Sequence, residues 1–325
     1  MSTNEERREA AKRKLEDRLE AERQQAHKRR MTVLGIVGVV ALAAVATGAF
    51  FGFRAWDNSR HTECTYAKAD DPFASLPTDE QMKQQTPADQ QEEAAKLLAL
   101  YREGMKQKRT APPPEDRTLK SGTVHITFDT SQGALPITMN RADAPCNVNA
   151  IESLAGGDYY KDVACHAMTV SDQGGAVLCG DPTGTAMVPG WMAGGNPGWV
   201  SPTEKPQNLK AAPSSGEQTD PTQQPVVYPR GTVAVANVDT SAAMQGGSGN
   251  PTGSATLYFF LQDTPMLPDF AVVGTVDKNG LAVLDKIKNG GIAAGPISGT
   301  TEPGKPLQSG VPKNKVVIEK TSVDK

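Results

Sequence analysis

The sequence lacks any concentration of positive charge outside its first 30 residues. Those residues carry ten basic and seven acidic side chains, a net charge of +3. Because the whole chain has a net charge of −3, residues 31–325 carry −6. A protein that binds nucleic acid presents clustered lysine and arginine on one face. The charge distribution therefore excludes an obvious nucleic-acid partner, and residues 1–30 are expected to form a charged, solvent-exposed helix.

Charged side chains are absent from residues 31–53, which is a run of 23 residues. As a helix, the segment would be about 35 Å long at 1.5 Å per residue, enough to cross a hydrocarbon core of about 30 Å. Three basic residues precede it, which places that end in the cytoplasm by the positive-inside rule. The alternative is a cleaved signal peptide, but the apolar run and the charged leader are too long for one. We expect a single-pass cell-membrane anchor at 31–53, with residues 1–30 cytoplasmic and later residues extracytoplasmic.

Cysteine is scarce, and all four cysteines follow the apolar segment: Cys64, Cys146, Cys165 and Cys179. No two of them are spaced Cys-x-x-Cys, which argues against a thioredoxin-like site or a zinc site. We accordingly expect neither a metal nor a cofactor. An oxidising compartment permits disulfides, and four cysteines allow three pairings.

Proline punctuates residues 54–120, which we interpret as an extracytoplasmic tether. Within the tether, residues 87–109 predict a helix, because acidic residues lie early in the segment and basic residues late. Its apolar residues form one weak face. That face either docks on the rest of the protein or simply stiffens the tether.

Short strands dominate residues 121–325. The alternating segments 123–129 and 134–140 flank a Ser-Gln-Gly turn and predict a hairpin. Helices are predicted at 144–157, with proline at its start and glycine at its end, and at 281–291. Further strands are predicted over six segments: 163–168, 176–179, 232–238, 257–262, 271–276 and 315–320. About eight strands with two helices are typical of a mainly β fold, a closed barrel capped at its ends. A long loop is expected at residues 181–230, and loops of this length are usually either functional or disordered.

Several motifs occur in a characteristic order after the hairpin and the Pro-Cys helix: "YYKDVACH", "CGDPTGT", "YPRGTVAVAN", "YFFL" and "VVGTV". This order resembles a cyclophilin-type peptidyl-prolyl cis-trans isomerase, most of all the membrane-anchored cyclophilins of actinobacteria. The resemblance covers roughly residues 123–320. It implies a closed eight-stranded barrel that binds a proline-containing peptide on its outer face.

The resemblance assigns the substrate groove to six residues: His166, Ala236, Asn237, Phe260, Leu267 and Phe270. Other groove positions depart from the family. Ala167 stands where the family carries an arginine that forms hydrogen bonds around the prolyl amide. Leu178 stands where the family carries a glutamine that orients the substrate backbone. Gly175 and Ala176 replace a phenylalanine and a methionine of the proline pocket, and Tyr258 replaces a second glutamine. The active site is therefore expected to be degenerate.

Residues of an inserted loop offer a substitute wall for the proline pocket: Trp191, Met192 and Trp199. Packing within the loop is the simpler interpretation of them. Arg230 is the nearest alternative cation, although a place on a surface turn is expected for it. The family register also sets Cys165 opposite Cys179 on neighbouring strands, which leaves Cys64 to pair with Cys146.

Prolyl isomerisation is slow because rotation breaks amide resonance, so an isomerase must bind the twisted amide better than the planar one. Arginine is a permanently charged, rigid donor suited to that task. A lost preorganised donor costs about 2.7–4 kcal/mol, or roughly a hundred- to a thousandfold in rate. We expect an isomerase of weak activity on proline-containing polypeptides of the cell envelope. Two alternatives remain open, a non-catalytic proline-peptide binding or chaperone-like module and a structural envelope protein.

Overall fold

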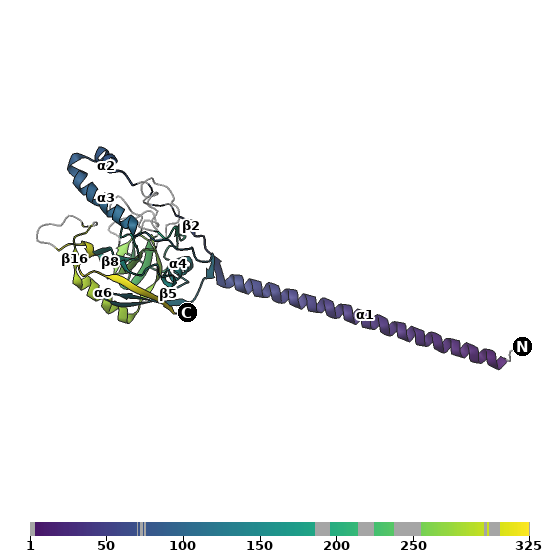
Figure 1. Cartoon of the computed structure of the whole chain (residues 1–325). Helices are drawn as coiled ribbons and strands as arrows, with labels where there is room; N and C mark the ends of the chain where they lie inside the picture. The colour runs from purple at the N-terminus through teal and green to yellow at the C-terminus, as the bar shows by residue number, and fades with distance from the viewer. Residues whose placement is uncertain are drawn as a thin grey trace. The chain divides into compact units, whose positions relative to one another are not determined.

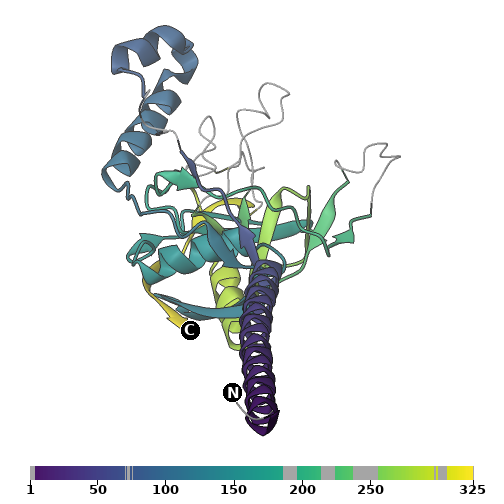
Figure 2. The same ribbon diagram turned by 90° about the vertical axis from the view of Figure 1, so that its right-hand side faces the viewer.

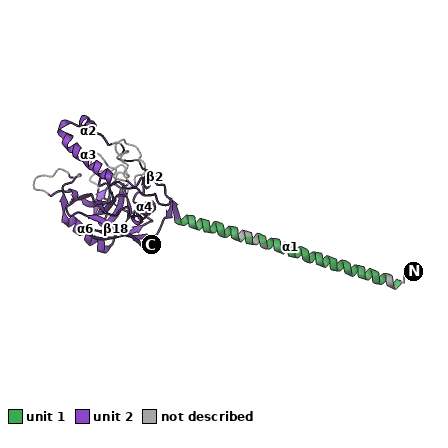
Figure 3. Cartoon of the chain, in the orientation of Figure 1, with its two compact units in different colours: residues 1–60 green, residues 61–325 purple. Residues whose placement is uncertain are grey.

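A computed structural model describes residues 4–69, 71, 74, 76–185, 196–213, 224–236, 255–295, 298 and 306–324. The chain divides into two compact units, residues 1–60 and residues 61–325 (Figure 3). The first unit contains one helix, and the second contains all the strands. The expected domain boundary at residue 121 stays a prediction.

The helix of the first unit, α1, extends from Asn4 to Arg60 (Figure 1). Among the residues that the structure describes, no helix has an apolar run long enough to cross a membrane. This finding contradicts the predicted anchor at residues 31–53 and the membrane localisation based on it. The apolar residues form the middle of a 57-residue helix whose two ends carry charged side chains.

The second unit is organised around a sheet of eleven antiparallel strands. In spatial order these are β16 (Ile292–Ala293), β17 (Ser309–Pro312), β7 (Ala167–Ser171), β8 (Gly174–Cys179), β13 (Leu257–Phe260), β12 (Thr232–Ala236), β15 (Phe270–Val276), β5 (Gly133–Asn140), β4 (Thr123–Thr130), β18 (Val317–Asp324) and β6 (Val163–Ala164). The predicted first hairpin is confirmed, since β4 pairs with β5 along its whole length. Alternate residues of β4 are buried, as the sequence pattern requires.

The sheet is open, so the prediction of a closed eight-stranded barrel is wrong. Its edge strands are β16 and β6, and no ladder of the described residues joins them. The physical reason lies at residues 163–168, where one strand was expected. That segment is interrupted at Cys165 and His166, so that β6 pairs with β18 while β7 pairs with β8 and β17. A disulfide bond joins Cys165 to Cys179 at the end of β8, as the family resemblance implied.

Two helices pack against the sheet and confirm those predicted from the sequence. Helix α4 (Pro145–Gly156) begins with proline, whose missing N–H is not needed in the first turn. Helix α6 (Lys278–Gly290) begins three residues before the predicted start at 281. The core between helices and sheet is built from fully buried side chains such as Ile126, Phe128 and Ile151.

Three smaller sheets and a helical hairpin complete the second unit. The sheets pair β1 (His61–Glu63) with β3 (Arg117–Leu119), β2 (Ala67–Lys68) with β9 (Trp199–Val200), and β11 (Val226–Tyr228) with both β10 (Lys210–Ala211) and β14 (Thr264–Met266). The hairpin consists of α2 (Asp79–Gln85), the short helix η1 (Ala88–Gln90) and α3 (Gln91–Lys106), and it projects from the unit (Figures 1 and 2).

The end of α3 docks on the sheet-bearing part of the unit, whereas Leu97 and Leu100 of its apolar face pack with Tyr101 and Leu76, so the alternative left open for that face stays open. Gly104 approaches so closely that a Cβ atom there would lie 2.6 Å from the carbonyl oxygen of Thr183. Just after the helix, the Arg109 guanidinium donates to the carbonyl oxygens of Tyr159 and Lys161. At position 104, therefore, only glycine fits the close contact with Thr183.

A second disulfide, between Cys64 and Cys146, ties the segment after residue 60 to the start of α4. The Tyr66 hydroxyl strengthens the same junction, because it donates to the carbonyl oxygen of Cys146 at 3.0 Å and accepts from the side-chain amide of Asn149 at 2.9 Å. The ring of Trp199 packs edge-on against Tyr66, with ring centroids 5.3 Å apart. Both disulfides implied by the family register are thus present.

Candidate functional site

The outer face of the sheet carries a row of residues that are direct cross-strand partners. Ala167 on β7 lies opposite Leu178 on β8, and Leu178 lies opposite Tyr258 on β13. Tyr258 in turn lies opposite Ala234 on β12. All four side chains belong to a hydrophobic cluster separate from the main core, because successive residues of a strand point to opposite faces. We call this cluster the outer cluster; its buried members are Ala167, Ala176, Leu178, Tyr228, Ala234, Tyr258, Phe260 and Phe270.

Four aromatic rings form the centre of the outer cluster. Tyr228 stacks on Phe260 with the ring centroids 4.9 Å apart and the planes 11° from parallel. Phe270 meets Tyr228 edge-on at 5.8 Å and Tyr258 edge-on at 4.7 Å. Offset-stacked and edge-on geometries are the favourable ones for aromatic pairs. The rings therefore hold one another in fixed positions.

Tyr228 covers Phe260, whose side chain is fully buried. Tyr228 lies over Phe260 because β11 pairs with β14, in a register that sets Tyr228 opposite Thr264. Its hydroxyl accepts from the backbone N–H of Phe270 at 3.3 Å and lies 3.3 Å from the carbonyl oxygen of Leu267, to which it donates. Burial raises the pKa of Tyr228 well above its ordinary value, so the ring stays neutral. Sequence reasoning assigned no role to this residue, and the motif "YPRG" before the strand 232–236 was the one local sign of it.

An open cavity of about 560 Å³ lies beside the outer cluster. Its lining comprises Thr169, Ser171, Gln173, Gly174, Gly175, Ala176, Leu178, Tyr258, Thr264, Pro265, Met266, Phe270, Gln308 and Ser309. Among these residues there is no lysine, arginine, histidine or carboxylate. The cavity is thus an uncharged site with an aromatic wall, and it suits an apolar ring better than an ion.

Gly175 forms part of the cavity wall where the family resemblance places a phenylalanine. A Cβ atom at Gly175 would lie 2.8 Å from the carbonyl oxygen of Thr169, so the backbone would have to shift to admit any side chain. The N–H of Gly175 donates to the hydroxyl of Thr264 at 3.0 Å. These contacts fix the glycine, and the small wall is a feature of this fold.

The hydroxyl of Tyr258 has no hydrogen-bond partner among the described residues, although its oxygen is shielded from water. The side chain is only 4% exposed. Burial raises the pKa of Tyr258 well above its ordinary value. The hydroxyl is therefore a neutral, protonated donor at physiological pH.

The structure brings two of the residues expected in the groove together, since Phe260 and Phe270 both belong to the outer cluster. Leu267 lies near them with 38% of its side chain exposed, and its carbonyl oxygen bonds to Tyr228. Ala236 ends β12 opposite Phe270.

The expected groove residue His166 lies outside the outer cluster. It is half-buried, and its backbone N–H donates to the carbonyl oxygen of Leu178 at 3.0 Å. Asn237 falls outside the described residues, as do Trp191 and Met192 of the inserted loop. The part that the resemblance gives to these residues stays a prediction.

Neither of the two other substitutes considered for the degenerate positions lines the cavity. Trp199 is buried against Tyr66, and its indole N–H donates to the carbonyl oxygen of Ala111 at 2.9 Å. The Arg230 guanidinium pairs with the carboxylate of Asp285 on α6 at 2.7 Å. Both side chains are committed to structural contacts.

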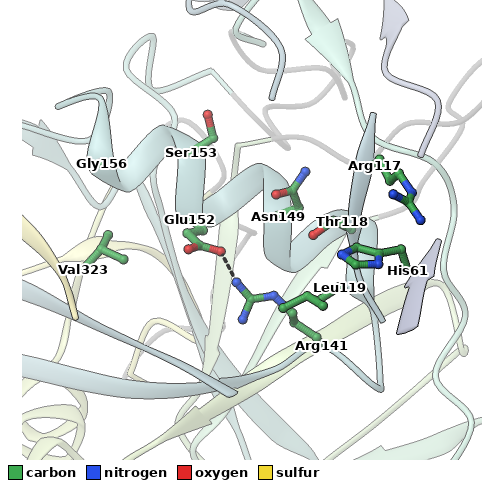
Figure 4. Close-up of a pocket in the computed structure, with 10 residues that line it drawn as sticks. All are labelled: His61, Arg117, Thr118, Leu119, Arg141, Asn149, Glu152, Ser153, Gly156 and Val323. Carbon is green, nitrogen blue, oxygen red and sulfur yellow. Dashed lines mark hydrogen bonds and ion pairs between the residues drawn. The ribbon is translucent and has the colours of Figure 1, made fainter. Parts of the chain in front are cut away.

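A second cavity, of about 460 Å³, lies between α4, β3 and β18 (Figure 4). Its charged groups are matched, because Arg141 pairs with Glu152 and Arg117 pairs with Glu63. No aromatic ring except the imidazole of His61 lines it. Its apolar side chains are Leu119 and Val323, so it lacks the aromatic wall of the first cavity.

Two curated relatives resemble this chain in sequence. The probable peptidyl-prolyl cis-trans isomerase B of Mycobacterium leprae is 34% identical over 205 residues, which cover 62% of this chain and 57% of the relative. The protein of the same name from Mycobacterium tuberculosis is 32% identical over 188 residues, 58% of this chain and 52% of the relative. The chain thus spans just over half the length of the relatives that it matches.

Comparison with solved structures adds a cyclophilin type peptidyl-prolyl cis-trans isomerase of Cryptosporidium parvum. It has a TM-score of 0.41 and 16% sequence identity, over 63% of this chain and 99% of that one. No protein-family model matches the chain. Over the part that they cover, this chain is therefore similar in sequence to two proteins named probable peptidyl-prolyl cis-trans isomerase B.

Proposed function

We propose that this protein is a weakly active peptidyl-prolyl cis-trans isomerase of the cyclophilin type that acts on proline-containing polypeptides in an oxidising compartment. The observation that carries the proposal is the uncharged cavity of about 560 Å³ beside the outer cluster. Tyr258, Met266 and Phe270 give that cavity an apolar wall, which suits a pyrrolidine ring. Similarity to the mycobacterial isomerases supports the same reaction.

Weak activity is expected because the cavity offers little to stabilise a twisted amide. No lysine or arginine lines it among the described residues, and both Ala167 and Leu178 are buried in the outer cluster. A preorganised donor of the missing kind accounts for roughly a hundred- to a thousandfold in rate. The remaining rate enhancement would come from fixing the proline ring and from excluding water.

The choice of compartment is supported by the two disulfide bonds. Structural disulfides persist in oxidising compartments and are rare in the reducing cytosol. The described residues contain no free cysteine. Substrates are therefore expected among secreted or envelope polypeptides.

A second candidate function is proline-peptide binding without turnover. The observation that favours it is the complete burial of Phe260 beneath Tyr228, at the position where the family resemblance expects the floor of the proline pocket. A peptide seated only in the neighbouring cavity would be held with no force twisting its amide bond.

The decisive experiment measures cis-trans exchange of a proline tetrapeptide by NMR, with the full chain and with a peptide in which alanine replaces proline as the substrate control. Thr169 is exposed and lines the cavity, so Thr169→Trp should block it. Thr123 is an exposed threonine at the start of β4, away from the cavity, and Thr123→Trp is the matched control.

We expect the wild type to catalyse exchange above background. Thr169→Trp should remove this activity, and Thr123→Trp should leave it intact. Peptide binding without any exchange would replace the isomerase by the binding module. If the wild-type chain neither binds nor exchanges the peptide, both functions are rejected.

A further inference from the structure

The family resemblance expects polar side chains at positions 167, 178 and 258 of one cross-strand row, and in this chain only position 258 carries one, as Tyr258. Ala167, Leu178 and Tyr258 follow one another as direct partners across β7, β8 and β13. The first two carry no polar side-chain atom. The third carries the hydroxyl that has no partner among the described residues.

We propose that the Tyr258 hydroxyl is the hydrogen-bond donor that holds a backbone carbonyl of the bound peptide, which makes Tyr258 a positioning residue for the substrate. The proposal rests on the proposed function, because it takes a proline-containing peptide as the occupant of the cavity. A buried hydroxyl without a partner is unfavourable. A ligand that supplies an acceptor removes this cost and gains affinity.

Two other hydroxyls of the cavity lining, those of Thr264 and Ser171, are already bonded. Thr264 accepts from Gly175 and donates to the carbonyl oxygen of Gln262 at 2.8 Å. Ser171 donates to the carbonyl oxygen of Gly174 at 3.3 Å. Tyr258 differs from Thr264 and Ser171 in that its hydroxyl is buried and has no partner among the described residues.

The raised pKa sets the kind of partner that suits Tyr258. A phenol that stays protonated is a donor, and a peptide carbonyl is an acceptor with no proton of its own. The oxygen is shielded in the ligand-free protein, so a side chain at the rim has to move when a peptide enters. Met266 lines the cavity, packs against the outer cluster and is only half-buried, and its flexible thioether chain adapts readily.

A matched tyrosine inside the main core supplies the control. The hydroxyl of Tyr160 is also buried and without a partner among the described residues, and its side chain is fully buried. Tyr160 belongs to the main core and lines neither cavity. Removing its hydroxyl changes the number of unpartnered polar atoms in the same way, but not at the proposed site.

The experiment compares the full-length wild type with Tyr258→Phe and Tyr160→Phe in titrations with the proline tetrapeptide. A neutral hydrogen bond of this kind is worth about fivefold in affinity, so we expect about fivefold weaker binding for Tyr258→Phe and no change for Tyr160→Phe. Neither substitution should lower the melting temperature, since each removes an unpartnered group. A purely structural role for Tyr258 would lower the melting temperature instead.

A spectroscopic measurement on the wild type needs no variant. With tyrosine labelled at the ζ carbon, the Tyr258 signal should shift on peptide addition as its hydroxyl gains an acceptor, while the Tyr160 signal should not. Equal affinities of wild type and Tyr258→Phe, or an unmoved Tyr258 signal at saturation, would overturn this assignment and leave the proposed function intact. A wild type that binds no peptide at all would overturn both.

Discussion

Tyr228 offers a direct test of the claim that the outer cluster closes over Phe260. Its ring stacks on Phe260 at 4.9 Å, meets Phe270 edge-on and is fully buried. Its hydroxyl is the acceptor for the N–H of Phe270. Tyr228→Ala should therefore uncover the face of Phe260 and weaken the fold at the same time.

The size of the loss can be worked out from these contacts. Tyr228→Phe keeps the ring but removes the acceptor of a buried N–H, which costs about 1–3 kcal/mol. Tyr228→Ala also removes a fully buried ring with two favourable aromatic contacts, and the free energy of unfolding should fall by about 3–5 kcal/mol. Chemical denaturation of the full chain at constant pH measures both changes.

Tyr228→Ala should increase the affinity for the peptide although it lowers the stability of the fold. An uncovered Phe260 presents an aromatic floor to a proline ring, so Tyr228→Ala should bind the proline tetrapeptide more tightly than wild type, whereas Tyr228→Phe should not. Tyr101, a buried tyrosine of α3 outside the outer cluster, is the control. Its replacement by alanine should cost stability without altering the affinity. If Tyr228→Ala loses stability and leaves the affinity unchanged, the argument that Tyr228 covers the binding face fails.

Three further predictions concern the rest of the second unit. Replacing both cysteines of the Cys64–Cys146 bridge by serine should lower the free energy of unfolding by about 4.5 kcal/mol, because that bridge closes a loop of 82 residues. The same change at Cys165–Cys179 should lower it by about 3 kcal/mol, because that loop spans 14 residues. A larger loss for the shorter loop in chemical denaturation would refute the loop-entropy reasoning. Glu204→Gln should cost about 1–2 kcal/mol, since its carboxylate accepts from the first backbone N–H groups of α4 at 3.0 and 2.9 Å, and an unchanged denaturation midpoint would count against it. Burial raises the pKa of Tyr66 to about 12, so the folded state favours its neutral form. Stability is therefore lost as the pH rises from about 10 to about 12. Tyr66→Phe should flatten that part of the plot of stability against pH, and an identical plot would show that the pKa of Tyr66 is not raised.

Local patterns in the sequence predicted the parts of the fold that depend on neighbouring residues. The alternation within β4 and β5, joined by a short turn, predicted their hairpin, and Pro145 marked the start of α4. The interruption of the strand at Cys165 and His166 was missed, because its cause is pairing with two distant strands, β18 on one side and β8 on the other. The closed barrel was predicted from the number of strands and from the family resemblance, and neither shows where the edge strands of the sheet lie.

The candidate site was predictable only where a family pattern supplied the register. That register assigned Phe260 and Phe270 to one groove, and both lie in the outer cluster, while their part in peptide binding stays a prediction. Tyr228 could not be found, since its position depends on β11 pairing with β14, which lies 36 residues further along the chain. The missing partner of Tyr258 was likewise invisible, because a tyrosine in an apolar strand usually bonds through its hydroxyl.

The covered face and the missing charge have a common physical explanation. Ala167 is fully buried within the outer cluster. An arginine at that place would carry a guanidinium into an apolar environment, with no carboxylate among the cavity-lining residues to pair with it. Burial of an unpaired charge is strongly unfavourable. Alanine at 167 and leucine at 178 are thus what a closed outer cluster requires, and restoring arginine alone should destabilise the fold before it can restore any rate. Under the proposed function, a proline ring reaches Phe260 only when Tyr228 moves away, so we expect Tyr228, more than position 167, to limit the isomerisation rate.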